Sequence, residues 1–240
     1  MKTITKKSNL TWYWCLLRIK VLWFNVECGK SKISSARIIG GVEAAPHSIP
    51  WQVAIFDHKI NNWEPQCGGT LISRSHVLSA AHCFEEPNNC SRYSVGLGMH
   101  NHDVSDGMRV DIHHISNHPN YRNICGMGIP ENDFSILHFA SPIEFNKTII
   151  PACYPDKSFG GDFLDGKDLT VSGWGTLMNG SYPENLHKAT LPGVTNEVCK
   201  MSNDDFSNCT YITENTLCAG DPDNRKASQG FSDSGGSIQC

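Results

Sequence analysis

Short apolar runs, each bounded by turn-forming residues, are the feature that most limits how this chain can fold. From residue 38 onward such runs recur, for example WQVAIF at 51–56, GTLISRSHVLSA at 69–80, DFSILHF at 133–139 and LTVSGWG at 169–175. Runs of this length, rich in β-branched residues and separated by Gly, Pro, Asn and Asp, are typical of the strands of a barrel or sandwich. Long helical periodicity is lacking, and residues 195–206 suit only a short helix. The chain is therefore expected to be all-β.

The cysteines indicate an extracellular protein. The chain has 11 cysteines in 240 residues and no Cys-x-x-Cys pair, which argues against a zinc ribbon. A disulfide-bonded, secreted protein is the simpler interpretation. Four Asn-x-Ser/Thr triplets fit the glycan acceptor pattern of such proteins. They begin at Asn89, Asn146, Asn179 and Asn208.

Charge and the N-terminal segment narrow the function classes further. The net charge is only −4, which disfavours nucleic acid or a membrane surface as a partner, since both call for clustered Lys and Arg. No run of 18 apolar residues occurs, so no ordinary transmembrane helix is expected. Residues 1–26 are signal-like but irregular, because Arg18 and Lys20 interrupt the apolar stretch. Residues 27–37 are small and polar, as in a linker.

Three residues lie in settings that suit acyl-transfer chemistry. His82 lies between small residues and Cys83 in LSAAHC, and an imidazole held in this way can act as a general base near neutral pH. Asp133 opens an apolar run, and Ser234 precedes two glycines that leave its hydroxyl uncrowded. Taken singly, each has a plainer interpretation as a structural histidine, a turn residue or a loop serine. Together they follow the order His, Asp, Ser, one of the known orders of the Ser-His-Asp triad.

The ordered segments CGGTLISRSHVLSAAHC, NDFSIL, VSGWG, TLCAG and DSGG resemble the trypsin/chymotrypsin family of serine proteases, from about residue 38 to residue 240. The resemblance implies two antiparallel β-barrels, at about 38–150 and 151–240, with the site in the cleft between them. It also implies that Ser234 attacks the scissile carbonyl, that His82 takes its proton, and that Asp133 orients the imidazole, as in the established mechanism of this family.

An activation site is implied as well. Arg37-Ile38-Ile39-Gly40-Gly41 resembles the family's cleavage site, so residues 27–37 would be a propeptide and 38–240 the protease domain. Cleavage after Arg37 by a trypsin-like protease would free the amine of Ile38, which by the resemblance pairs with Asp233. A bridge between Cys28 and Cys153 would keep the propeptide attached.

The resemblance also suggests how the cysteines pair and which ligands are absent. It implies the bridges Cys67–Cys83, Cys28–Cys153 and Cys199–Cys218, with Cys90–Cys125 as a further alternative; the pairing of Cys209 and Cys240 stays open. No cofactor and no metal are expected. In the loop where some relatives bind calcium, the acidic end ligands correspond to Met99 and Arg109, which suit calcium poorly. The spacing of five neighbouring histidines matches no metal motif: His100, His102, His113, His114 and His118.

Three departures from the family pattern bear on activity. Phe231 and Ser232 are inserted before Asp233, so the oxyanion hole would use the N–H groups of Ser232 and Ser234, with serine in place of the usual glycine. The floor of the specificity pocket falls at Lys226 or Ser228, and neither is the acidic residue that selects Arg or Lys. The chain ends at Cys240, soon after Ser234, so an incomplete second barrel is expected, as in a truncated sequence.

The sequence therefore predicts a secreted serine endopeptidase that is made as a zymogen. Its expected partners are protein or peptide substrates, an activating protease and protein protease inhibitors, with neither nucleic acid nor membrane, and the resemblance suggests a monomer. One alternative is a catalytically inactive homologue that acts as a binding or regulatory module. Another is a truncated fragment.

Overall fold

Burial on one or both faces accompanies the formation of strands by the apolar runs. The computed structural model describes residues 28–31, 33, 41–60, 63–102, 106–124, 129–154, 164–177, 180–201, 212, 216–220, 234–236 and 238–239. In strand β9 (Ser135–Phe139), the side chains at 135, 137 and 139 are buried and the two between them are half-exposed. Successive side chains of a strand point to opposite faces, so β9 gives one face to the core. The strands at Gln52–Asp57, Cys67–Leu71 and Tyr93–Leu97 are instead buried at every position.

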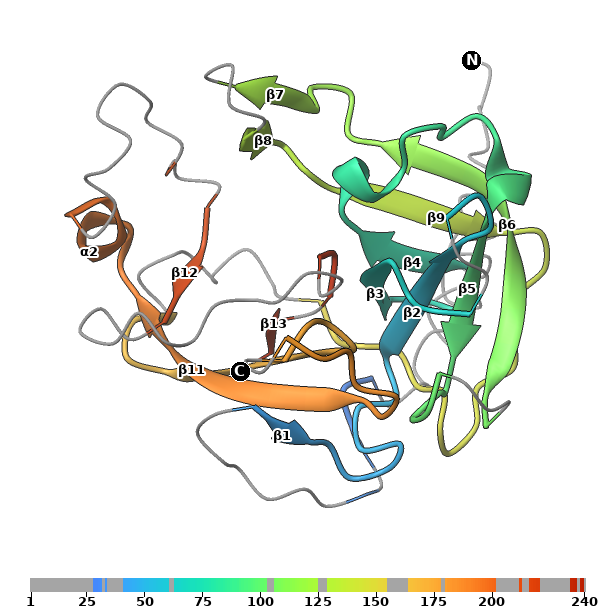
Figure 1. Ribbon diagram of the computed structural model, residues 1–240, viewed down its shortest axis with the longest axis horizontal. Coiled ribbons are helices and arrows are strands. Elements are labelled where there is room, and N and C mark those ends of the chain that lie inside the picture. Colours follow the sequence, from blue (N-terminus) through green and yellow to red (C-terminus); the bar gives the residue numbers. More distant parts are fainter. Residues whose placement is uncertain are drawn as a thin grey trace, which may run out of the picture.

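Six such strands close into a barrel, shown at the right of Figure 1. Their order around the barrel is β2-β3-β4-β9-β6-β5, and every neighbouring pair is antiparallel. Besides β9, the barrel strands are β2 (Gln52–Asp57), β3 (Cys67–Leu71), β4 (His76–Ser79), β5 (Tyr93–Leu97) and β6 (Met108–Asn117). Closure leaves no unpaired strand edge. The all-β prediction is confirmed.

One predicted run proves to be two strands. Residues 69–80 turn back on themselves between β3 and β4, where Ser73 Oγ accepts a hydrogen bond of 3.1 Å from Ser75 N–H. Serine hydroxyls favour such turns because they hydrogen-bond nearby backbone groups. The turn brings Thr70 opposite Leu78.

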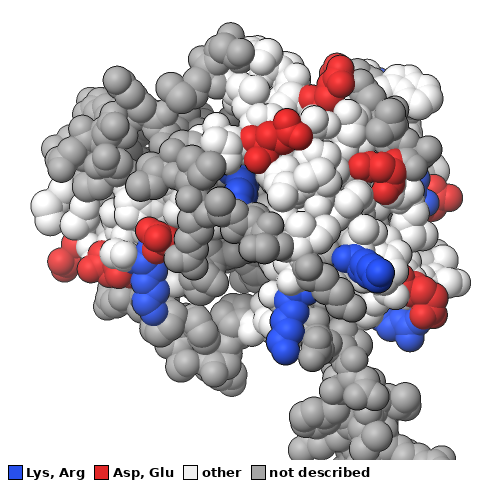
Figure 2. Space-filling view, turned by 90° about the horizontal axis from the view of Figure 1, so that it is seen from below, with Lys and Arg blue, Asp and Glu red and all other residues white. Residues whose placement is uncertain are grey.

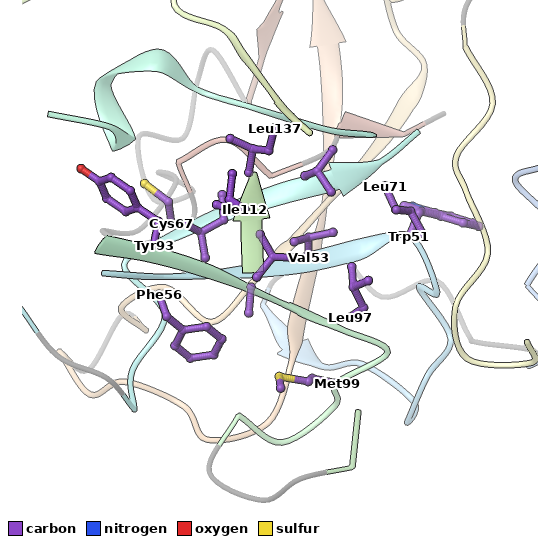
Figure 3. Packing of buried hydrophobic residues seen from close by; sticks show 14 of the residues in the cluster. Trp51, Val53, Phe56, Cys67, Leu71, Tyr93, Leu97, Met99, Ile112 and Leu137 are labelled. Carbon is purple, nitrogen blue, oxygen red and sulfur yellow. The ribbon is translucent and has the colours of Figure 1, made fainter. Parts of the chain in front are cut away.

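The core of the molecule fills this barrel. Figure 3 shows Val53, Leu71, Leu97, Ile112 and Leu137 converging from different strands. Each of these side chains is at most 5% exposed. Burial of large aliphatic side chains stabilises a fold by about 1.5–3 kcal/mol each, so the barrel interior is the main source of stability for the elements around it.

A second sheet lies beside the barrel, with strand order β1-β11-β10-β13 and β12 paired to β11. It consists of β1 (Val42–Glu43), β10 (Asp168–Gly173), β11 (His187–Val194), β12 (Cys218–Ala219) and β13 (Ile238–Gln239). Its described strands do not close into a barrel, which agrees with the incomplete second barrel that was predicted. A buried hydrogen bond of 2.7 Å from Ser172 Oγ to Gln52 Oε1 joins β10 to the barrel strand β2.

Short elements complete the described part of the chain. They are the 3-10 turns η1 (Ala81–Cys83) and η2 (Cys90–Arg92), the hairpin β7 (Arg122–Ile124) and β8 (Ile129–Glu131), and helix α2 (Asn196–Met201). Helix α2 lies within the predicted 195–206, of which 202–206 fall outside the described residues. Within the described ranges, no helix is both long and apolar enough to cross a membrane.

Candidate active site

His82 is held in a short turn at the end of a barrel strand. Strand β4 leads into η1, in which Ala81 is buried and His82 is exposed. A disulfide from Cys83 to Cys67, with an S–S distance of 1.98 Å, ties this turn to β3. The small buried residues allow the turn to lie against the barrel, and the bridge limits how far the imidazole can move.

Asp133 meets both the backbone and the ring of His82. The His82 Nδ1–H donates to Asp133 Oδ2 at 2.6 Å, and the His82 backbone N–H donates to Asp133 Oδ1 at 2.8 Å. Asp133 lies two residues before β9, and it follows Asn132, which is in the left-handed region at φ 53°. Asparagine is among the few side chains that tolerate that conformation. The turn thus aims the carboxylate at a residue 51 positions earlier in the chain.

The pair shifts the pKa values of both groups. The hydrogen bond that His82 donates to Asp133 raises the pKa of the His82 imidazole above its ordinary 6.5, against partial burial, which lowers it. Burial alone would raise the pKa of Asp133, but the hydrogen bonds from His82 outweigh burial and hold that pKa below 3.8. Asp133 therefore stays ionised near neutral pH, and it fixes the tautomer in which His82 Nε2 is free to accept a proton.

The segment 234–236 lies directly against β3 and the end of β4. Gly68 N–H donates to the Ser234 carbonyl oxygen at 2.7 Å. Gly235 has φ +83°, and a Cβ on it would lie 2.6 Å from Gly68 O and 2.9 Å from Ala80 N. A Cβ on Gly68 would in turn lie 3.1 Å from Gly236 Cα. Glycines on both sides are therefore what allow these two backbones to approach so closely.

This packing brings Ser234 to the same disulfide that adjoins His82. The sulfur of Cys83 lies 3.8 Å from the Ser234 carbonyl oxygen and 3.8 Å from His82 Nε2. Within the described part of the chain no hydrogen bond joins the Ser234 hydroxyl to His82. Catalytic hydrogen bonds are often long until substrate binds. The structure thus joins His82 to Asp133 directly and brings the Ser234 backbone to the sulfur of Cys83, which also lies beside His82 Nε2.

Several predicted site residues cannot be placed. Arg37, Ile38, Lys226, Ser228, Ser232 and Asp233 lie outside the described residues. The activation site, the specificity pocket and the second oxyanion donor therefore stay predictions.

A pocket of about 690 Å³ opens beside His82. It is lined by Ala81, His82, Phe84, Glu85, Pro87, Asn117, Tyr121, Asn123 and Pro130. These lining residues were not predicted from the sequence, and they come from four separate stretches of the chain. The aromatic and proline residues of the loops after His82 and before Asp133 were the available signal, but only the fold brings those loops together.

Comparisons with known proteins agree with this geometry. The family model described as "Trypsin" matches residues 38–240. The chain belongs to the trypsin/chymotrypsin family of serine proteases. Chymotrypsin-C of Mus musculus is 35% identical over 86% of this chain and 73% of its own length. The clotting factor G beta subunit of Tachypleus tridentatus is 34% identical, over 88% and 68% of the two chains.

A solved structure gives the same result. Neuropsin, described as a serine protease expressed in the limbic system of mouse brain, superposes with a TM-score of 0.70. It is 27% identical, and the match covers 85% of this chain and 82% of that one. The trypsin-like fold of this family member thus rests on both sequence and structure.

The disulfides expected of a trypsin-family protein can now be compared with the structure. Among the described residues, the structure contains the expected disulfides Cys28–Cys153, Cys67–Cys83 and Cys199–Cys218, with S–S distances of 2.02, 1.98 and 2.06 Å. The alternative fourth bridge, Cys90–Cys125, is not formed, because Cys90 carries a free thiol. The Cys90 sulfur lies in its own 3-10 turn, 3.6 Å from the carbonyl oxygen of Pro87. Cys125, Cys209 and Cys240 lie outside the described residues.

Side chains at the ends of the 99–109 loop offer no oxygen ligands to a metal. Met99 is 6% exposed and belongs to the barrel core. The guanidinium carbon of Arg109 lies 3.7 Å from the centre of the Phe56 ring, a cation–π contact. An apolar side chain and a cation stand where calcium would need carboxylates.

Proposed function

We propose that this protein is a secreted serine endopeptidase that hydrolyses peptide bonds through Ser234, His82 and Asp133. The observation that carries the proposal is the double hydrogen bond from His82 to Asp133, formed beside the backbone of Ser234. Membership of a protease family supports the same reaction.

The geometry supports a division of labour among the three residues. Ser234 Oγ attacks the carbonyl carbon of the substrate while its proton passes to His82 Nε2. The imidazolium then gives that proton to the leaving amine, which yields an acyl-enzyme that water hydrolyses in the same way. Asp133 acts by holding the ring and by stabilising the imidazolium.

Substrates of this site are proteins or peptides. The pocket beside His82 has aromatic and proline side chains in its wall, from Phe84, Pro87, Tyr121 and Pro130. Such a wall suits apolar residues of an extended peptide next to the bond that is cut. Figure 2 shows acidic and basic residues interspersed on the face seen from below, with no described patch of one sign there.

Zymogen activation is part of the proposal. Cleavage after Arg37 would free the Ile38 amine to pair with Asp233, and forming that buried pair would order the neighbouring oxyanion loop. The Cys28–Cys153 disulfide supports this scheme, because it joins the segment before the cut to the body of the protein.

Secretion and glycosylation are supported by local geometry. The three disulfides between described residues suit an oxidising compartment. At Asn146 the side-chain oxygen accepts hydrogen bonds from Thr148 N–H and Oγ1–H, at 2.8 and 3.0 Å. The Ser91 hydroxyl makes the same contact with Asn89 at 3.0 Å. Both acceptor triplets are thus in exposed turns where a glycan could be attached.

One observation favours a second candidate function. Ser232 stands where the family has glycine in the oxyanion hole, and the loss of one donor there lowers kcat by about 10²–10³. This departure favours an inactive homologue that binds proteins without cutting them.

A covalent probe separates the two candidates. The full chain is treated with a fluorophosphonate before and after cleavage at Arg37, with Ser234→Ala as the control. The endopeptidase proposal expects labelling that depends on both cleavage and Ser234. A cleaved, folded protein that stays unlabelled would rule out the endopeptidase and leave the inactive homologue.

A further inference from the structure

Three histidines outside the candidate active site form a row across neighbouring strands of the barrel. His76 on β4 is the Cα partner of His138 on β9, and His138 is also the partner of His114 on β6. Figure 1 shows these three strands side by side. Because their neighbours Val77 and Leu137 are buried in the core, the three imidazoles share the outer face of the barrel, with His138 in the middle.

The rings of this histidine row are close enough for like charges to repel each other. The ring centres of His76 and His138 are 4.9 Å apart, and those of His114 and His138 are 5.3 Å apart. Two unit charges of the same sign about 5 Å apart repel each other appreciably near a protein surface. The outer two rings are on opposite sides of His138, so a charge on the middle ring is repelled by both of them.

A β-bulge adds a fourth imidazole to the row. The register of β6 against β9 shifts between Ile112 and His114, and His113 and His114 are both exposed. A regular strand would turn one of these two side chains inward, but a bulge re-aims it. Burial and the charges of His76, His114 and His113 together lower the pKa of His138.

The three strands bring almost no negative charge to the row. Strands β4 and β9 carry no ionisable side chain besides His76 and His138, and the one carboxylate of β6 belongs to Asp111. Asp111 pairs with Ser94 on β5 and lies past the end of β9 in the register. It is not among the groups that shift the pKa of His138.

The other charged groups beside these strands are engaged elsewhere. Arg109 of β6 stacks on Phe56, with its guanidinium carbon 3.7 Å from the centre of the ring. Arg74, in the turn before β4, forms an ion pair with Glu144. These groups therefore leave positive charge on the row without a carboxylate partner.

Two serine hydroxyls bind the rings without offsetting their charge. Ser73 Oγ is hydrogen-bonded to His76 Nδ1 at 2.7 Å, and Ser116 Oγ to His138 Nε2 at 3.1 Å. A hydroxyl can donate to a neutral ring or accept from a protonated one, so both contacts tolerate protonation but supply no negative charge. His82 differs, because its hydrogen bond to a carboxylate raises its pKa.

We propose that the histidine row is an acid-sensitive element that weakens the closed barrel below about pH 6.5, where imidazoles gain protons. In acid, positive charges would accumulate on one face of three paired strands, and unfolding would relieve their repulsion. The lowered pKa of His138 gives the same sign: the folded chain binds fewer protons there than the unfolded chain, so stability falls as pH drops through 6.5.

The strands that carry the row also hold the proposed catalytic pair. Strand β4 leads into the turn that contains His82, and Asp133 lies two residues before β9. Acid would therefore act on the part of the barrel that positions the pair. The inference does not rest on the proposed function, because it concerns the stability of the uncleaved chain.

The test is thermal unfolding of the full, uncleaved chain at pH 7.5 and 5.5. His138→Gln and His76→Asn each replace a ring by a neutral amide that can reach the same serine. On acidification, Tm should change less favourably in the unsubstituted chain than in either variant, by about 2–4 °C. A merely structural role would shift Tm equally at both pH values, so the readout is the change of Tm with pH.

A double variant and a control separate repulsion from other effects. The gain in acid tolerance of His76→Asn/His138→Gln should be smaller than the sum of the two single gains, because the repulsion between these rings is removed only once. His118→Asn should behave like the unsubstituted chain, since His118 follows the end of β6 and packs on Phe134 at a ring distance of 4.5 Å.

Three results would overturn the proposal. These are an unchanged pH dependence of Tm in folded His76→Asn, fully additive gains in the double variant, or an equal gain in His118→Asn. Circular dichroism checks that each variant is folded. His76→Asn alone decides the question if His138→Gln does not fold, because a ring that repels His138 is removed there without a change of the middle residue.

Discussion

At the scale of single residues, the site depends on one carboxylate that does two jobs. Asp133 accepts hydrogen bonds from the ring and from the backbone of His82, so it fixes both the position of η1 and the tautomer of the imidazole. The same contacts raise the pKa of His82 and lower that of Asp133. The position of the His82 ring and the pKa values of both side chains are therefore set by the same pair of residues.

Asp133→Asn tests this coupling through pH. A general base works when neutral, so kcat/KM of the activated protein should rise with pH through the raised pKa of His82, with a midpoint above 6.5. Removal of the carboxylate should shift that midpoint to lower pH and lower kcat about 10⁴-fold at neutral pH, because the tautomer is no longer held. Peptide hydrolysis measured across the pH range gives both quantities.

Stability should respond to the same pair with a definite sign. The raised pKa of His82 contributes stability that is present below 6.5 and is lost as pH rises through the folded pKa. The lowered pKa of Asp133 contributes stability that is present above 3.8 and is lost as pH falls. The difference in unfolding free energy between the native chain and Asp133→Asn should therefore be largest between these two values. A difference that does not vary with pH would contradict the assigned shifts.

At the scale of elements, the site depends on close backbone packing between β3 and the segment 234–236. Gly68 and Gly235 face each other across this contact: a Cβ on Gly235 would clash with Gly68 O and Ala80 N, and a Cβ on Gly68 would be crowded by Gly236 at 3.1 Å. The hydrogen bond from Gly68 N–H to Ser234 O fixes the register of the two segments. The segment 234–236 is thus positioned by direct contact with the first barrel.

Gly235→Ala measures the importance of this contact, with Gly180→Ala as its control. Both glycines have nearly the same positive φ, +83° and +82°, but a Cβ on Gly180 would meet nothing within 4 Å. Each change should cost about 1–2 kcal/mol from the left-handed backbone. Gly235→Ala should cost more, and it alone should reduce fluorophosphonate labelling, because it displaces Ser234. Equal losses of Tm and equal labelling in the two variants would show that the close packing is not required.

At the scale of the whole molecule, covalent and packing links join parts that are far apart in the sequence. The Cys28–Cys153 disulfide spans 125 positions, strand β1 pairs with β11, and Ser172 hydrogen-bonds to Gln52. These links connect the N-terminal segment and the second sheet to the closed barrel. The proposed activation by a cut near the N-terminus would therefore act on a chain whose parts stay joined by these links.

Cys28→Ser should release the propeptide after cleavage at Arg37. In the native chain the disulfide should keep the cleaved segment attached, so that only reducing electrophoresis separates it. The variant should lose the segment without reduction, as detected by intact-mass measurement. Cys90→Ser is the matched control, because Cys90 is a free thiol and its removal should leave the tether unchanged. Release of the segment from the native chain without reduction would contradict the tether.

The local pattern of the sequence determined the strand-forming runs, the all-β class and the candidates His82, Asp133 and Ser234, because strand periodicity and residue chemistry are written along the chain. Family resemblance added the three disulfide pairings. The reversal within residues 69–80, the free thiol of Cys90, the pocket beside His82 and the histidine row on β4, β9 and β6 required the tertiary structure. Each of these depends on strand register and on contacts between distant segments, and those are decided by how the side chains pack together in three dimensions.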